Sequence, residues 1–224
     1  MVELRVPNPM LDLRLFARRT FSAPVVSALL SYGASITTSF LLPLALIQGR
    51  GMSPAQAGLI LTSQPIVMAL TASISGSLSD RIGSRAPATI GMAVLALGLL
   101  LLSRVDVSTP IPFIVTVLLV TGPGIGLFTS PNNSAVLGAV PSQRRGVANG
   151  ILGTARTLGM LLGIALAGAV YATSLGLQGD PGPAGILQAA DTGFLVASII
   201  AAIGAETSAT RPAARPTGHK DRAA

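Results

Sequence analysis

Residues 76–85 read GSLSDRIGSR, a polar segment between two apolar stretches that carry almost no charge. Each flanking stretch has roughly the twenty residues that a helix needs to cross a bilayer. A turn between two membrane helices needs polar groups at the bilayer surface, and glycine permits a tight backbone turn there. The segment therefore predicts a short polar connection between two membrane spans. A plain topology-setting turn and a functional loop both remain open on these grounds.

The composition indicates a membrane protein. The chain has 224 residues, of which 50% are hydrophobic and 10% charged, and its mean hydropathy is +0.68. Roughly a quarter of the residues of soluble domains are charged, so this chain has too few charged side chains to cover the surface of a soluble protein. It has no cysteine, which excludes disulfides and thiolate metal sites, and its one histidine, His219, lies in a polar C-terminal tail. No cofactor, metal site or catalytic residue is expected.

Apolar segments of about the right length occur six times along the chain. They are residues 24–47, 57–75, 86–102, 111–129, 147–172 and 192–205. Residues 130–145 are predicted to form a loop with a short amphipathic turn, and the Gly- and Pro-rich residues 173–191 an irregular connection. The expected organisation is a cytoplasmic linker over 1–23, a six-helix membrane domain over 24–206 and a disordered basic tail over 207–224.

Arginine and lysine residues predict the orientation. Two of them, Arg50 and Arg104, fall on one predicted side of the membrane, and twelve fall on the other. The twelve are Arg5, Arg14, Arg18, Arg19, Arg81, Arg85, Arg144, Arg145, Arg211, Arg215, Lys220 and Arg222. Basic residues concentrate in cytoplasmic loops, so both termini are expected in the cytoplasm of a multi-pass cell-membrane protein. The net charge of +7 is thus read as a topology signal at a lipid bilayer, and no nucleic-acid partner is expected.

The spacing G-x-L-x-D-R-x-G-x-R resembles the signature loop of the major facilitator superfamily. The matching residues are Gly76, Leu78, Asp80, Arg81, Gly83 and Arg85. The resemblance implies a latch at the cytoplasmic face, in which Asp80 meets a helix end and an arginine, with Arg85 in that second role. It also implies that the latch opens and closes as the transporter alternates its access.

Three further stretches, 11–21, 41–61 and 130–168, resemble the C-terminal half of fourteen-helix drug–proton antiporters. Two features of the N-terminal half are missing, because the fourth span has no arginine and the Gly-Pro run 122–126 lies one helix too early. The fold class implied is an all-α membrane protein, with six transmembrane helices as a 3+3 inverted repeat. The implied partners are a missing N-terminal half of six to eight helices or a second copy, a small-molecule substrate and protons.

The fifth span carries a charge within the membrane. Arg156 shares one helical face with Asn149, Gly159, Gly163 and Ala167 at 100° per residue. The three small residues predict close helix packing. Arg156 is expected to face a wet central cavity and to find its partner in a substrate or in an acidic group of the missing half. The alternative is that it reaches the cytoplasmic interface along its aliphatic stem.

Gln64 and Tyr32 are further cavity candidates within the first two spans. For Gln64, a hydrogen bond to a neighbouring helix explains a polar side chain in mid-span equally well. The sequence thus predicts half of a proton-coupled exporter of small amphipathic drugs or metabolites. A truncated, non-transporting remnant or an accessory membrane subunit is the alternative. An intramembrane enzyme is disfavoured, since no span holds a histidine, a cysteine or an acidic pair.

Overall fold

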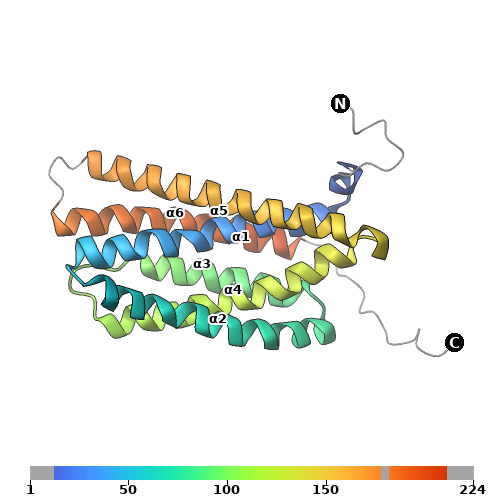
Figure 1. Cartoon of the computed structure of the whole chain (residues 1–224), viewed down its shortest axis with the longest axis horizontal. Helices are drawn as coiled ribbons and strands as arrows, with labels where there is room; N and C mark the ends of the chain where they lie inside the picture. The colour runs from blue at the N-terminus through green and yellow to red at the C-terminus, as the bar shows by residue number, and fades with distance from the viewer. Residues whose placement is uncertain (1–12, 178–181, 211–224) are drawn as a thin grey trace.

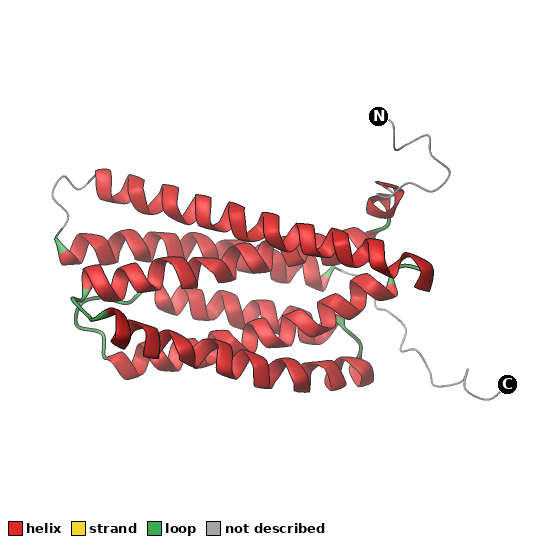
Figure 2. Cartoon of the chain, viewed as in Figure 1, coloured by secondary structure: helices red, strands yellow, loops and turns green. Residues whose placement is uncertain are grey.

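The computed structural model describes residues 13–177 and 182–210, and in these ranges the chain is almost entirely helical (Figure 2). The six long helices are α1 (Arg19–Leu44), α2 (Pro54–Ile82), α3 (Arg85–Leu102), α4 (Ile111–Gly138), α5 (Arg145–Gly176) and α6 (Pro183–Ala209). A π-helical turn, Ala45–Gly49, prolongs α1, and short 3-10 turns, Leu13–Ala17 and Ser142–Arg144, precede α1 and α5. Each long helix is long and apolar enough to cross a membrane.

The helices alternate in direction, and their first residues differ between the two ends of the bundle (Figure 1). Arginines begin the three helices that start at one end: Arg19, Arg85 and Arg145. We call this the basic end. Prolines occupy the first turn of the three that start at the opposite end: Pro54, Pro112 and Pro183. Proline suits a first turn because its missing N–H would have no helical partner there, so these prolines mark where the returning helices begin.

Helix packing divides the bundle into two interlocked groups (Figure 1). Helix α1 packs against α5 and α6, and α4 packs against α2 and α3, while α3·α6 and α1·α4 contacts join the two groups. Exchanging α1 with α4, α2 with α5 and α3 with α6 reproduces this set of contacts. Because α1 and α4 start at opposite ends, the two three-helix segments form an inverted repeat. The predicted fold class is therefore confirmed.

Glycines hold α4 at the centre of its group. A Cβ atom added at Gly122 would lie 2.6 Å from the carbonyl oxygen of Gln64 in α2, and Gly126 also meets α2. On another face of α4, a Cβ at Gly124 would lie 2.8 Å from the backbone nitrogen of Leu95 in α3. Lipid provides no hydrophobic drive for helix association, so such backbone-to-backbone approach supplies the packing energy.

The connections are shorter than the sequence predicted, and the segment 76–85 is mostly helix. Helix α2 continues to Ile82, and α3 starts at Arg85, so two residues separate them. One of these is Gly83, with φ of 85°, a conformation that favours glycine. The prediction of a ten-residue polar loop was wrong because polar side chains are compatible with a helix that projects beyond the hydrocarbon core.

The same error affected two other connections. Residues 130–145 were predicted to be a loop, but α4 continues through 138. Residues 173–191 were predicted to be irregular, yet α5 continues to 176 and α6 begins at 183, so Asp191 lies inside a helix. The glycines and prolines of this stretch gather around its middle, and residues 186–190, Ile-Leu-Gln-Ala-Ala, contain no glycine or proline to interrupt a helix.

The predicted domain limits shift in the same direction. Helix α1 begins at Arg19, before the expected end of the linker at residue 23, and α6 ends at Ala209, within the expected tail. The rest of that tail, and the start of the linker, lie outside the described residues.

Candidate functional site

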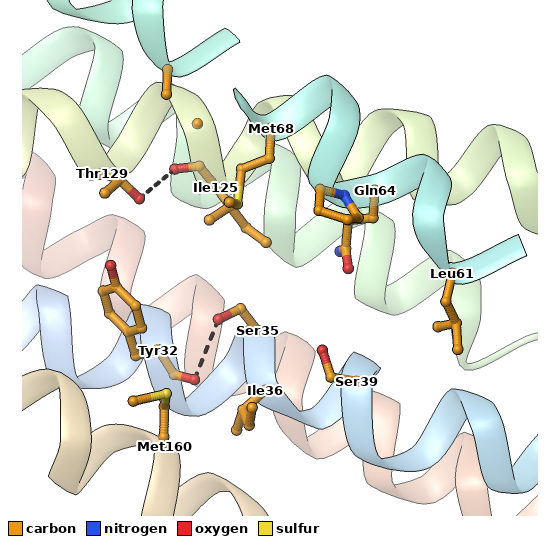
Figure 3. Close-up of a pocket in the computed structure, with 13 residues that line it drawn as sticks. Tyr32, Ser35, Ile36, Ser39, Leu61, Gln64, Met68, Ile125, Thr129 and Met160 are labelled. Carbon is orange, nitrogen blue, oxygen red and sulfur yellow. Dashed lines mark hydrogen bonds between the residues drawn. The ribbon is translucent and has the colours of Figure 1, made fainter. Parts of the chain in front are cut away.

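A cavity of about 420 Å³ opens on the side of the bundle where α1, α2, α4 and α5 come together (Figure 3). Its walls are mainly apolar, with a few hydroxyl groups and one amide. The lining residues are Tyr32, Ser35, Ile36, Ser39, Leu61, Gln64, Pro65, Met68, Ala72, Ile125, Gly126, Thr129 and Met160. An apolar pocket with a few polar groups is the usual form of a small-molecule site.

Gln64 both forms a hydrogen bond to a neighbouring helix and lines the cavity, the two alternatives that its sequence position left open. Its side chain is buried, and Nε2 donates a hydrogen bond of 3.0 Å to Oγ1 of Thr121 in α4. The Thr121 hydroxyl in turn donates to the carbonyl oxygen of Leu118. Gln64 also lines the cavity and points into the space between α2 and α1 (Figure 3). It therefore ties α2 to α4 and presents a polar surface to the cavity.

Arg156 lies beside this cavity, half-buried, and is held from two sides. Its Nη2 donates a hydrogen bond to Oδ1 of Asn133 in α4. On the other side, Cζ lies 5.3 Å from the ring centroid of Tyr32, a cation–π contact with α1. The Nε atom of Arg156 is buried without a hydrogen-bond partner. Both contacts are neutral groups, so the positive charge has no counter-ion among the described residues.

Asn133 was not among the site residues predicted from the sequence. It falls within residues 130–145, which were read as a loop. Extending the fourth span through Pro131-Asn132-Asn133 would have placed two amides on a membrane helix, and that was the signal available. Asn132, next to it, is buried within the bundle.

Two glycines of α5 form its contact with α1. A Cβ atom at Gly159 would lie 2.3 Å from the carbonyl oxygen of Leu29, and one at Gly163 would lie 2.3 Å from that of Gly33. These distances are far below ordinary van der Waals contact. At the GxxxG pair the backbones of α5 and α1 therefore approach closely, which small side chains permit.

The predicted common face of α5 divides along its length. Ala167 is buried like the two glycines, whereas Arg156 is half-buried and Asn149 is exposed near the basic end. The role of Asn149 in a cavity remains a prediction.

The signature segment occupies the basic end, where α2 turns into α3. Its exposed members are Leu78, Asp80, Arg81 and Arg85. Gly76 lies close to α4, since a Cβ there would be 3.1 Å from Oγ of Ser130. No described residue forms an ion pair or hydrogen bond with the Asp80 carboxylate. Asp80 lies in the last turn of α2, where the helix dipole disfavours an anion and favours Arg81.

At the opposite end, the α3–α4 connection is organised by one carboxylate. Asp106 accepts hydrogen bonds of 2.8 Å from the hydroxyls of Ser108 and Thr109. These two bonds, that from Ser108 first, lower the pKa of Asp106 below its ordinary value. Nη2 of Arg50 donates to the carbonyl oxygen of Val107 and joins the neighbouring loop to this turn. Nowhere in residues 13–177 and 182–210 do three His, Cys, Asp or Glu side chains gather as metal ligands.

Comparison with known proteins supports the architecture. The sequence profile of the Major Facilitator Superfamily matches residues 25–223. The chain is 34% identical over 173 residues to the riboflavin transporter RibZ of Clostridioides difficile, covering 77% of this chain and 38% of that protein. It is 32% identical to the multidrug resistance protein Stp of Mycobacterium tuberculosis, covering 80% and 33%. It is also 32% identical to the uncharacterized transporter YebQ of Escherichia coli, covering 95% and 45%.

Solved structures show the same arrangement of helices. The structure of a bacterial homologue of the human drug peptide transporters PepT1 and PepT2 superimposes with a TM-score of 0.77 at 18% identity, over 88% of this chain and 43% of that one. A proton-dependent oligopeptide transporter gives a TM-score of 0.78 at 17% identity, over 89% and 43%. The chain thus spans less than half the length of each relative described here. With its six apolar helices, inverted repeat and profile match, the chain is a multi-pass membrane protein of the major facilitator superfamily of transporters.

Proposed function

We propose that the chain forms one half of a proton-coupled exporter of small amphipathic molecules in the cell membrane, with both termini in the cytoplasm. The observation that carries this proposal is the cavity beside Arg156. Residues of α2 and α5 form two of its walls, together with residues of α1 and α4. In the most apolar stretch of α2 and in that of α5, 17% of the residues are buried, against 44–56% in the other four helices. A second six-helix unit placed against α2 and α5 would close the cavity.

The cavity walls suit a flat, largely apolar substrate. Met68 and Met160 offer adaptable thioether surfaces from opposite walls, and Tyr32 offers an aromatic face. Hydroxyls of Ser35 and Ser39 supply a few polar contacts. The names of the relatives refer to riboflavin, to multiple drugs and, for a quinolone resistance protein of Staphylococcus aureus, to quinolones. These names favour substrates that contain aromatic rings.

Arg156 is proposed to bind an anionic group within the membrane. A charge at mid-bilayer costs at least about 2.5 kcal/mol unless it finds a partner or water. Asn133 and Tyr32 satisfy the guanidinium only in part, because it has five N–H donors and a full charge. The remaining partner is either an anionic substrate group or a carboxylate on the second half.

Asp80 is proposed to act as the latch of the signature segment. It is exposed, it has no partner among the described residues, and its helix dipole disfavours it. No described contact of its own half stabilises this carboxylate, which favours a partner on the other half.

Co-expression of the two halves tests the proposal. The chain would be produced with the N-terminal half of one of the named transporters, and that half with its own C-terminal half serves as positive control. We expect export of a fluorescent drug from the pair, none from the chain alone, and none from the pair that carries Arg156→Leu at equal membrane abundance. Ile199→Ala, at an exposed position of α6 outside the surface proposed to meet the second half, should leave export intact.

Two results would contradict the proposal. Export by the chain alone would show that no second half is needed, and normal export by the Arg156→Leu pair would remove the arginine from the mechanism. Absence of export from every pairing, with a working positive control, would instead favour a non-transporting remnant or accessory subunit.

A further inference from the structure

A second hollow, separate from the cavity beside Arg156, lies at the basic end between α1 and α5. It has a volume of about 430 Å³ and an almost wholly apolar lining. Its walls include Phe16 from the 3-10 turn before α1, Val26 and Leu29 from α1, and Gly150, Thr154 and Leu158 from α5. We call it the α1–α5 groove. In Figure 1 this turn and the starts of both helices lie together at one end of the bundle.

The groove is shaped by small residues and by a fixed aromatic ring. Gly150 leaves open space, since a Cβ added there would meet nothing within 4 Å. The Thr154 hydroxyl donates to the carbonyl oxygen of Gly150 at 3.1 Å, so it is satisfied within its own helix. Phe16 packs edge-on against the buried ring of Phe21, with centroids 5.6 Å apart.

The depth of the groove matches one leaflet of a bilayer. Gly150 and Leu158 lie five and thirteen residues after the start of α5 at Arg145. At 1.5 Å per residue they are therefore about 8 and about 20 Å along the helix. Half of a hydrocarbon core is about 15 Å thick. With Arg145 at the membrane surface, most of the groove thus lies at the depth of the acyl chains of the leaflet that meets the basic end.

The mouth of the groove is positively charged. Arg18 and Arg19 follow Phe16 closely, Arg145 precedes the α5 wall, and all three side chains are exposed. Neither α1 nor α5 has an acidic residue in its first turn or a side-chain cap. Two uncapped helix N-termini and three arginines therefore converge where an apolar groove reaches the membrane surface, and each of these features favours a phosphate group.

We propose that the α1–α5 groove binds an anionic phospholipid, with an acyl chain along α5 and the phosphate among Arg18, Arg19 and Arg145. Lipid can fill any apolar hollow in a membrane, so the groove alone would select no headgroup. The arginines provide the selection, because a basic residue near the membrane surface changes the affinity for anionic lipid about fivefold. The proposal is independent of the transport function.

The absence of tryptophan from the sequence makes a direct test possible. Phe16→Trp places a single indole in the groove wall, in the full chain reconstituted into vesicles. Brominated acyl chains quench indole fluorescence on contact. We expect stronger quenching by brominated phosphatidylglycerol than by brominated phosphatidylcholine at the same mole fraction in a phosphatidylcholine background.

Two sets of variants separate the headgroup from the groove. Replacing Arg18, Arg19 and Arg145 by glutamine should abolish the preference, while Arg81→Gln with Arg85→Gln, at the same end but on α2 and α3, should preserve it. Gly150→Leu should reduce quenching by both lipids because the leucine fills the groove. Gly58→Leu is its matched control, as a Cβ there also meets nothing within 4 Å.

Three outcomes would overturn the proposal. Equal quenching by the two brominated lipids would show that the headgroup is not recognised. A preference that persists in the triple glutamine variant would assign it to general surface charge. Weak quenching by every brominated lipid would mean that another part of the protein fills the groove.

Discussion

Replacing Gly163 by alanine should weaken the whole bundle, although alanine is the better helix former. The added Cβ atom would lie 2.3 Å from the carbonyl oxygen of Gly33 and 2.8 Å from its Cα atom. Ordinary contact begins at 3.4 Å, so α1 and α5 must separate by about 1 Å at this crossing, the difference between the two values. Both atoms belong to the backbone of α1, which cannot rotate aside as a side chain could.

Two opposing effects set the magnitude of this change. Overpacking of a tight contact costs about 1–3 kcal/mol, and a gap of 0.5–1 Å loses roughly a quarter to a half of the dispersion energy of each contact along it. Alanine in place of a mid-helix glycine gains roughly 0.5–1 kcal/mol. We therefore expect Gly163→Ala to lower the free energy of unfolding by about 1–2 kcal/mol. Gly153→Ala, in the same helix but with no neighbour within 4 Å, should raise it or leave it unchanged.

Reversible unfolding in mixed micelles, followed by circular dichroism, measures both variants against the unmodified chain. The pair of variants controls for helix propensity, since the same chemical change is made twice in α5. If Gly163→Ala were as stable as Gly153→Ala, the α1–α5 contact would not be the tight approach described here. If both were destabilised equally, the effect would belong to the helix and not to the crossing.

Three further predictions concern the polar ends of the helices. Reporter fusions after Arg50 and after Arg85 should signal from opposite sides of the membrane, with the second in the cytoplasm; identical signals would contradict the orientation. Asp80→Asn should leave the chain as stable or slightly more stable, because the helix dipole disfavours the carboxylate, yet abolish export by the reunited halves; full export would reduce the signature segment to a turn. The hydrogen bonds that lower the pKa of Asp106 stabilise its ionised form in the folded chain. Their contribution to stability is present above the ordinary pKa of 3.8 and is lost as the pH falls through the lowered value. The stability difference between the unmodified chain and Asp106→Asn should therefore vanish in acid, and a difference that persisted there would assign the effect to packing.

Features that depend on the order of residues along one helix could be predicted from the sequence. The class of protein, six spans and the separation of basic residues follow from composition and spacing, because a bilayer sorts each segment by length and charge. Gly159 and Gly163 could also be assigned to a helix contact, because their spacing along one helix places two small residues on one face. The ends of the helices could not, since polar residues 76–82 and 130–138 remain helical where the helices extend past the apolar spans.

The partner of each helix was decided only by the tertiary structure. Nothing in the sequence indicates that α5 packs on α1, or that Arg156 meets Asn133 from one side and Tyr32 from the other. Lipid is as apolar as the side chains it touches, so hydrophobicity does not choose between possible helix pairs. Shape and a few polar contacts make that choice, and they join residues far apart in the chain. The cavity beside Arg156 and the α1–α5 groove exist only once those helices have come together.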